Sequence, residues 1–449
     1  MAVRSCPLFL LCLITVVTLA CNPSAETDGG PDTPPGDDGG AGSSSSGDAG
    51  GARDAGGTDA GSRPDAGTPR VDPACQEDGC LRATTHLGNY GRAAILPYLE
   101  PGVQIDNGYS VHTIRFATDG RESTATVTIP YDVGLQPPEG GWHVVGNNHG
   151  TSGLEDLCAP SMSLSGPGLA GLFGARGLIG VAVDYPGLGT AGLHPYLVSR
   201  VEGTSALDAL RAATNLALLL EQPVSRRYAM VGLSQGGHAT LAAATLHATH
   251  APELDIRAFG AAAPASAWES QWRAGVAIAG GHIAYHAMVV YAWADFYGFD
   301  DLPLWADGFA DDVDGIMTTQ CIYDPNGGAT IFSSVPTDPA QVFHAAFLSE
   351  YQGGQWQTYT AMRDAFAANA IAPYTQTAPL RIYQGDVDST VPEAATSEMV
   401  AALRAGGVTV DYVVVSGGGH VDVAFGFVAQ NQLRTEESVD WLRGQLDAP

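Results

Sequence analysis

Strand-like runs alternate with helical segments through most of the chain, and this alternation constrains its fold more than any other feature. Several runs are apolar throughout and bounded by glycine, as expected of strands that are covered on both faces. Between them lie helical segments such as residues 205–222 and 239–251. The pattern predicts an α/β fold, with a mostly parallel sheet and helices on both of its faces. The strand-like runs are SVHTIRFAT, STATVTIPYDV, WHVVGNN, GLIGVAVDY, RRYAMVGL, IRAFGAAAP, PLRIYQGDV and VTVDYVVVS.

One long interval breaks the alternation, between a run that ends near Ser266 and the run that begins at Pro379. It reads as helix and loop, and we expect an insertion at about residues 267–375 that caps one edge of the sheet. Most of its aromatic side chains should form the cap's own core, while some present apolar surface to the sheet edge. These residues are Trp268, Trp272, Tyr285, Tyr291, Trp293, Phe296, Tyr297, Phe299 and Trp305.

The start of the chain lacks the pattern of a packed domain. Residues 1–21 combine one early arginine with an apolar run and a small residue before Cys21, which predicts a bacterial export signal. A buried core helix is the alternative. Residues 22–72 consist mainly of Gly, Ala, Asp, Ser and Pro, and such a segment buries too little apolar surface to offset its ordering entropy. We therefore expect a disordered tether, followed by a folded domain at residues 73–449.

The tether directly after the signal resembles the stalk of a bacterial lipoprotein, with Cys21 as the lipidated residue. The match is imperfect, because Thr18 stands where such signals usually have leucine. Ordinary signal cleavage and free secretion is the alternative. Both interpretations predict an exported protein, either secreted or held in the cell envelope.

The chain carries a formal net charge of −28, and all of its basic residues are arginines. No basic cluster exceeds the pair Arg226 and Arg227, which argues against binding to a nucleic-acid backbone. The acidic surface mainly favours solubility. Contact with a membrane is expected only through a lipid on Cys21.

Seven cysteines are present, and three of them lie in the signal or at its end. The other four are an even number in an exported protein, which favours two disulfides. Cys75 and Cys80 are close enough to pair locally, which leaves Cys158 to pair with Cys321 in the cap interval. A zinc site is the competing interpretation, although the C-x-x-C spacing is absent.

The stretch VGLSQGGHA contains a G-x-S-x-G motif centred on Ser234. With 57 glycines in the chain, the motif alone carries little weight. Its context is more specific, because RRYAMVGL reads as a buried strand and the residues after the serine read as a helix. A sharp strand-to-helix turn needs Gly232 and Gly236, where a Cβ would crowd the backbone, and it lifts the serine hydroxyl above the sheet. Ser234 is therefore the candidate nucleophile.

A serine nucleophile needs a base, and the base needs a carboxylate that orients it. His420 follows the last strand-like run and a flexible GGG, so it is the candidate base. His344 lies inside the cap interval, and His238 lies on the helix after the serine. The loop YQGDVDSTVPEA offers two carboxylates, Asp386 and Asp388, just beyond a strand. We choose Asp388 as the acid, with Asp386 as the alternative.

Acyl transfer also needs two backbone donors for the oxyanion that forms on the substrate carbonyl. The N–H of Gln235, directly after the serine, is the first candidate. The loop after WHVVGNN contains His149 and Gly150, and the N–H of Thr151 is the second candidate. An ordinary glycine turn is the alternative for this loop.

Taken in order, these motifs resemble the α/β-hydrolase superfamily and, more narrowly, the bacterial and fungal secretory lipase/esterase family. The resemblance covers about residues 85–430, and it implies a serine carboxylic-ester hydrolase with a helical cap inserted before the acid strand. The family's nucleophile, acid and base fall on Ser234, Asp388 and His420, while Asp184 orders a neighbouring loop. A small-molecule or lipid ester would be the substrate, with no cofactor and no metal. The motifs are NNHGTSG, LCAPS, VAVDYPGLGTAGLHPYL, ALDALRAA, VGLSQGGHA, GDVDSTVP and GGGH.

Two other functions remain open. A serine aminopeptidase on the same scaffold would need carboxylates in the cap to hold a substrate amine, and ADDVDG at residues 310–315 offers candidates. That run is also consistent with a solvated loop. A non-catalytic tethered surface protein is the other alternative, although such a protein would be expected to have lost a member of the triad.

Overall fold

The computed structural model describes residues 70–96, 104–162, 168–265, 269–423 and 432–449. The expected export signal with Cys21, and nearly all of the expected tether at residues 22–72, lie outside these residues. Trp268 of the cap also lies outside them. Within the described part of the chain, no helix is both long enough and apolar enough to cross a membrane.

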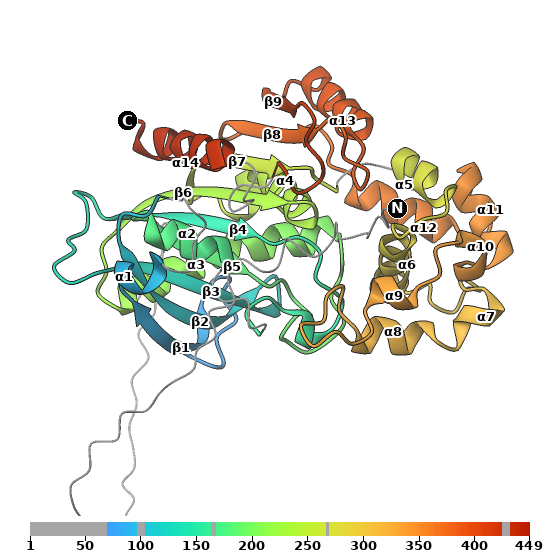
Figure 1. Cartoon of the computed structure of the whole chain (residues 1–449), viewed down its shortest axis with the longest axis horizontal. Coiled ribbons are helices and arrows are strands. Elements are labelled where there is room, and N and C mark those ends of the chain that lie inside the picture. Colours follow the sequence, from blue (N-terminus) through green and yellow to red (C-terminus); the bar gives the residue numbers. More distant parts are fainter. Residues whose placement is uncertain (1–69, 97–103, 163–167, 266–268, 424–431) are drawn as a thin grey trace, which may run out of the picture. The chain divides into compact units, whose positions relative to one another are not determined.

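A nine-stranded sheet in the order β1-β2-β3-β5-β4-β6-β7-β8-β9 organises the described chain (Figure 1). The pairs β1–β2, β2–β3 and β3–β5 are antiparallel. From β5 to β9 every neighbouring pair is parallel, which confirms the mostly parallel sheet expected from the sequence. The strands are β1 (Leu81–Tyr90), β2 (Gly108–Thr118), β3 (Arg121–Tyr131), β4 (Trp142–Asn148), β5 (Ile179–Val183), β6 (Val224–Leu233), β7 (Asp255–Ala262), β8 (Leu380–Gly385) and β9 (Val410–Val415).

Each strand-like run of the sequence forms a strand of the sheet. Strand β1 is an additional strand that the sequence pattern did not predict. Strand β1, with the sequence LRATTHLGNY, lies at the edge of the sheet and leaves much of its length half-buried or exposed. An edge strand of this kind needs no continuous apolar run, so the hydrophobic pattern alone did not reveal it.

Helices cover both faces of the sheet, as the sequence predicted. Successive side chains of a strand point to opposite faces, so Val144 and Val145 of β4 belong to different cores. Val144 packs in the core that includes α3 and α4, while Val145 packs in the core that includes α2 and α14. These helices and their neighbours are α1 (Arg92–Ile95), α2 (Gly168–Ala175), α3 (Ser199–Leu219), α4 (Gln235–His250), α13 (Glu393–Ala405) and α14 (Gln432–Asp447).

Two helix boundaries differ from the sequence expectation. The helix expected at 205–222 is α3, which begins at Ser199, and the helix expected at 239–251 is α4, which begins at Gln235. Glycine lies near the start of each helix, at Gly203 of α3 and at Gly236 and Gly237 of α4, and glycine is a poor helix former, so propensity places the starts too late. Close packing of α3 on α4 requires a glycine at the first of these positions, because a Cβ at Gly203 would lie 2.8 Å from the backbone of Ala242 on α4.

The interval between β7 and β8 holds helices α5 to α12, where the sequence placed the cap. Trp293 and Phe299 are buried in a separate core of this region, and other aromatic side chains pack against it. The same core includes Tyr196 and Val201, which ties the cap to the start of α3. The cap helices are α5 (Glu269–Val276), α6 (Ile283–Tyr297), α7 (Asp307–Ala310), α8 (Val313–Thr319), α9 (Ile331–Ser334), α10 (Pro339–Val342), α11 (Ala345–Gly353) and α12 (Thr360–Asn369).

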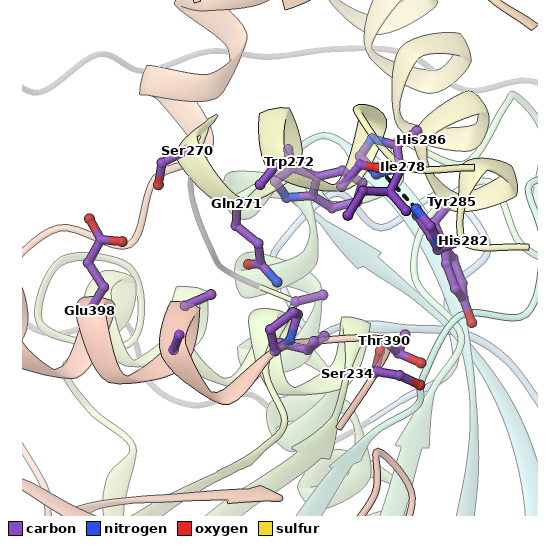
Figure 2. Close-up of a pocket in the computed structure, with 18 of the residues that line it drawn as sticks. Ser234, Ser270, Gln271, Trp272, Ile278, His282, Tyr285, His286, Thr390 and Glu398 are labelled. Atoms are coloured by element: carbon purple, nitrogen blue, oxygen red, sulfur yellow. Dashed lines mark hydrogen bonds between the residues drawn. The ribbon is translucent and has the colours of Figure 1, made fainter. Parts of the chain in front are cut away.

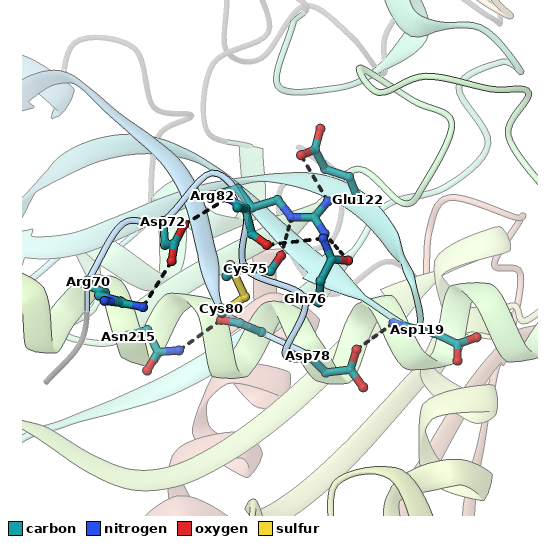
Figure 3. The surroundings of a disulfide bond; sticks show 12 residues. Arg70, Asp72, Cys75, Gln76, Asp78, Cys80, Arg82, Asp119, Glu122 and Asn215 are labelled. Carbon is teal, nitrogen blue, oxygen red and sulfur yellow. Dashed lines mark hydrogen bonds and ion pairs between the residues drawn. A yellow bond between two sulfur atoms is a disulfide. The ribbon is translucent and has the colours of Figure 1, made fainter. Parts of the chain in front are cut away.

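Disulfides join Cys75 to Cys80 and Cys158 to Cys321, as the sequence predicted. The competing zinc interpretation is wrong, because all four thiols are used in these bonds. Figure 3 shows the first disulfide beside α3, where Asn215 donates a hydrogen bond of 3.0 Å to the carbonyl of Gly79. The second disulfide spans 163 residues and connects the cap to the segment that follows β4.

Candidate active site

Ser234 lies on a sharp turn between β6 and α4, with φ 58° and ψ −115°. A positive φ is unusual for a residue other than glycine, and it persists only where the surrounding structure enforces it. Here the N–H of Ser234 donates to the carbonyl of Ala262 at 2.9 Å. Its carbonyl accepts from the N–H of His238 at 3.0 Å and of Ala265 at 3.1 Å. These hydrogen bonds hold the serine in a strained conformation above the end of β6.

The glycines that flank the serine are required by close backbone contacts. A Cβ at Gly232 would overlap the carbonyl of Gly236, and a Cβ at Gly236 would overlap the carbonyl of Asn148 at the end of β4. The expectation that side chains at these positions would crowd the turn is therefore confirmed. The second contact also brings the segment after β4 against the turn.

His420 and Asp388 meet at the carboxyl ends of β9 and β8. Their Nδ1 and Oδ2 atoms lie 2.8 Å apart, and the Asp388 side chain is fully buried. Asp388 also accepts hydrogen bonds from the N–H groups of Thr390 and Val391 at 2.8 Å and from the amide of Gln384 at 3.0 Å. A carboxylate surrounded by donors acts as an acceptor, so Nδ1 of His420 carries the hydrogen and Nε2 is left to accept a proton.

Asp386, the alternative acid, lies apart from this contact. It is exposed, and its carboxylate accepts a hydrogen bond of 2.6 Å from the N–H of Gly417. Its role in the structure is to hold the loop that precedes His420. The geometry thus favours Asp388 over Asp386 as the partner of His420.

The two candidate oxyanion donors lie on segments that meet at the turn. Gln235 is fully buried at the start of α4. Gly150 approaches so closely that a Cβ there would lie 3.9 Å from the Cβ of Ser234, which places the neighbouring Thr151 near the serine. The Thr151 hydroxyl lies 2.8 Å from the hydroxyl of Tyr196. Sequence reasoning assigned no role to Tyr196, although it lies within the motif quoted above.

Asp184 is buried, and its carboxylate accepts hydrogen bonds from the Thr124 hydroxyl at 2.6 Å and the Ser161 N–H at 2.9 Å. Burial raises the pKa of this carboxyl above its usual range. The backbone carbonyl of Asp184 lies 3.2 Å from Nε2 of His149. Asp184 thereby braces the loops around the candidate oxyanion segment, in line with the ordering role expected for it.

Ser234 lines a cavity of about 410 Å³ (Figure 2). The cap contributes one side through α5 and α6, and residues 389–392 of the loop after Asp388 contribute another, together with the start of α13. The lining includes the apolar side chains Trp272, Ile278, Val391 and Pro392. In Figure 2, Ser234 lies beside Thr390, and Glu398 lies toward the opposite end of the drawn side chains.

The remaining candidates from the sequence lie elsewhere. His344 caps the N-terminus of α11 in the cap, and His238 is buried on α4. The acidic segment 310–315 forms parts of α7 and α8, and none of its residues is among those that line the cavity described here. The segment therefore forms no part of the wall of this cavity.

Two family models match parts of the chain. The model described as "Secretory lipase" matches residues 171–269, and the model described as "Prolyl oligopeptidase family" matches residues 330–448. The first contains Ser234, and the second contains Asp388 and His420. No curated protein sequence matches the chain.

Solved structures share the fold. The rice cell wall degrading esterase LipA from Xanthomonas oryzae is 23% identical, with a TM-score of 0.69 over 82% of this chain and 98% of that chain. A putative hydrolase from Legionella pneumophila is 21% identical, with a TM-score of 0.69 over 82% and 99%. Candida antarctica lipase A in its closed state is 16% identical, with a TM-score of 0.60 over 83% and 84%.

These findings agree with the mostly parallel sheet flanked by helices. The secretory lipase match indicates a carboxylic-ester hydrolase of the lipase/esterase type. The chain belongs to the α/β-hydrolase superfamily.

Proposed function

We propose that this chain hydrolyses carboxylic esters through an acyl-enzyme formed on Ser234, with His420 and Asp388 completing a catalytic triad. One observation carries the proposal. The strained turn of Ser234 and the loop that directly follows Asp388 line the same largely apolar cavity beneath the cap. A serine, an oriented imidazole and an apolar cavity are the parts that ester cleavage needs.

In this mechanism, Nε2 of His420 takes the hydroxyl proton of Ser234 as the serine oxygen attacks the ester carbonyl. Asp388 holds the imidazolium through its hydrogen bond to Nδ1. The N–H groups of Gln235 and Thr151 stabilise the oxyanion. His420 then protonates the leaving alcohol, and the acyl group stays on the serine until water, activated by the same imidazole, releases the acid.

The cavity supports an apolar ester, from either a small molecule or a lipid, as the substrate. Trp272 and Ile278 of the cap and Val391 of the acid loop present apolar surface beside Ser234. Each buried methylene of the substrate is worth about 0.8 kcal/mol, so butyryl should gain about 1.6 kcal/mol over acetyl, or roughly tenfold. We expect kcat/KM to rise from acetyl to at least butyryl or hexanoyl esters.

A panel of nitrophenyl esters of increasing acyl length measures this preference, with Ser234→Ala as the blank for each ester. A steady fall from acetyl onward would contradict an apolar acyl site. The same panel includes aminoacyl anilides, because the prolyl oligopeptidase match and the carboxylate of Glu398 at the cavity leave a peptidase as the second candidate. We expect anilides to be poor substrates. Efficient anilide cleavage that is lost in Glu398→Gln would favour the peptidase.

The disulfides and the secretory lipase match indicate an exported protein. We propose in addition that a lipid on Cys21 anchors the folded domain through the tether. Cys21→Ser is then expected to move the protein from the detergent phase to the aqueous phase in a partitioning assay. Cys12→Ser, within the signal, serves as the matched control. Equal aqueous partitioning of the wild type and both variants would show that Cys21 carries no lipid anchor.

A further inference from the structure

A buried carboxylate lies directly behind the turn of Ser234. Glu202 is in the first turn of α3 and is fully buried. Burying a charge is costly unless polar partners surround it. The partners of Glu202 are two side chains in the first turn of α4 and one strained backbone N–H, and two of these three partners lead toward the candidate oxyanion donors.

The first partner is the side chain of Gln235, whose backbone N–H is a proposed oxyanion donor. Its amide Nε2 lies 2.8 Å from Oε1 of Glu202 and 2.8 Å from Nε2 of His194. Nδ1 of His194 lies 2.9 Å from the carbonyl of Pro186, which it can contact only as a donor. Burial lowers the pKa of His194 to about 4, so its neutral ring leaves Nε2 as an acceptor. Both amide hydrogens of Gln235 are therefore used, and its side chain is fixed.

The second partner is His238, one turn along α4. Its Nδ1 lies 2.7 Å from Oε2 of Glu202, and its Nε2 lies 2.8 Å from the hydroxyl of Ser199. That hydroxyl donates to the carbonyl of Asn369 at 2.7 Å, so it accepts the hydrogen of Nε2. A second proton then lies between Nδ1 and Oε2. The contact between Glu202 and His238 anchors the first turn of α4.

The third partner is the N–H of Leu197, which donates to Oε1 of Glu202 at 2.8 Å. Leu197 has a φ of 55°, a strained value for leucine, so this contact stabilises a conformation that the residue would otherwise avoid. The strained backbone sets the direction of the neighbouring Tyr196, whose side chain lines the cavity and whose hydroxyl contacts Thr151. The indole N–H of Trp293 in the cap holds the carbonyl of Tyr196 at 2.9 Å.

We infer that Glu202 is a positioning residue for the oxyanion hole, because it holds Gln235 directly and orients Thr151 through Leu197 and Tyr196. This inference rests on the proposed function. Ser199, His238 and Glu202 do not form a second catalytic triad, because the Ser199 hydroxyl gives its hydrogen to Asn369 and does not line the cavity described here. Glu202 acts on the reaction through the donors it holds in place.

The test compares Glu202→Ala with Glu202→Gln. Alanine removes every contact of the carboxylate, and a displacement of about 1 Å at a donor costs roughly a hundredfold in rate. We expect kcat of Glu202→Ala to fall by about a hundredfold, with KM changed by less than about threefold. The inhibition constant of a trifluoromethyl ketone, which mimics the oxyanion, should rise by the same factor. Glutamine keeps one carbonyl oxygen, which can accept from both Gln235 and Leu197, and an amide N–H that can donate to Nδ1 of His238, so kcat of Glu202→Gln should recover to within about tenfold of wild type.

Asp208→Ala is the matched control, because Asp208 is a second fully buried carboxylate on α3 and pairs with Arg211 and His250 away from the serine. It should lower the melting temperature and leave kcat per active site within about twofold, with active sites counted by phosphonate titration. If Glu202→Ala does not fold, Gln235→Leu removes the same contact from the other side, and its kcat should fall at least tenfold.

The inference is overturned if kcat of the folded Glu202→Ala variant stays within threefold of wild type, or if Glu202→Gln is as impaired as Glu202→Ala. If Glu202→Ala does not fold, unchanged kcat in Gln235→Leu overturns it. Ser234→Ala separates this failure from failure of the proposed function. Full turnover in Ser234→Ala would refute the function itself, whereas loss of turnover there with normal turnover in Glu202→Ala would refute only the role of Glu202.

Discussion

Replacing Ser234 with alanine is expected to lower kcat for ester hydrolysis by at least about 10⁴-fold and to leave the fold intact. The serine hydroxyl is the proposed attacking group, and without it only the oxyanion donors and the cavity remain to assist attack by water. Alanine and serine have the same conformational strain in the backbone at φ 58°. The backbone hydrogen bonds of the turn do not involve the serine hydroxyl. The melting temperature should therefore change little.

The measurement is kcat for a butyryl ester, with the purified variant checked for its melting temperature. Ser225→Ala is the matched control, because Ser225 lies at the opposite end of β6, where its hydroxyl contacts His143 at 2.6 Å. Its kcat should equal that of the wild type. If Ser234→Ala retains more than about a hundredth of the wild-type kcat, Ser234 is not the nucleophile.

Replacing Asp388 with asparagine is expected to lower kcat by about 10³- to 10⁴-fold. The amide would present a donor or a weaker acceptor to Nδ1 of His420, and a donor there favours the tautomer that carries its hydrogen on Nε2. That tautomer cannot accept the proton of Ser234. Most of the loss should appear in kcat, because Asp388 does not line the cavity described above.

Asp386→Asn supplies the comparison, since Asp386 lies two residues away and contacts only the backbone N–H of Gly417 among the hydrogen bonds described for its side chain. We expect its kcat to remain within about tenfold of the wild type. The assignment of the acid would be reversed if Asp386→Asn were the more impaired variant. Equal and small effects of both substitutions would instead argue against a triad at this position.

Local pattern by itself determined the strands, the turn of Ser234 and the place of the cap. Both faces of β4 and β6 are covered by helices, so consecutive residues of these strands are apolar. This run of apolar residues can be recognised in the sequence directly. The glycines at 232 and 236 also reveal the turn in the sequence. A side chain at either position would clash with backbone a few residues away or at the end of one neighbouring strand. Strand β1 escaped this reasoning because an exposed edge carries little hydrophobic signal.

Tertiary structure alone decided which distant side chains meet. Asp386 and Asp388 lie in the same loop of the sequence, and only the approach of β9 and the following loop brings His420 to Asp388 at 2.8 Å. The network of Glu202 joins α3, the strained Leu197 and the first turn of α4, and no periodicity in the sequence marks a buried carboxylate as the partner of Gln235. Hydrogen bonds between side chains require donor–acceptor distances that are correct to within a few tenths of an ångström. The packing of the whole sheet and its helices sets these distances.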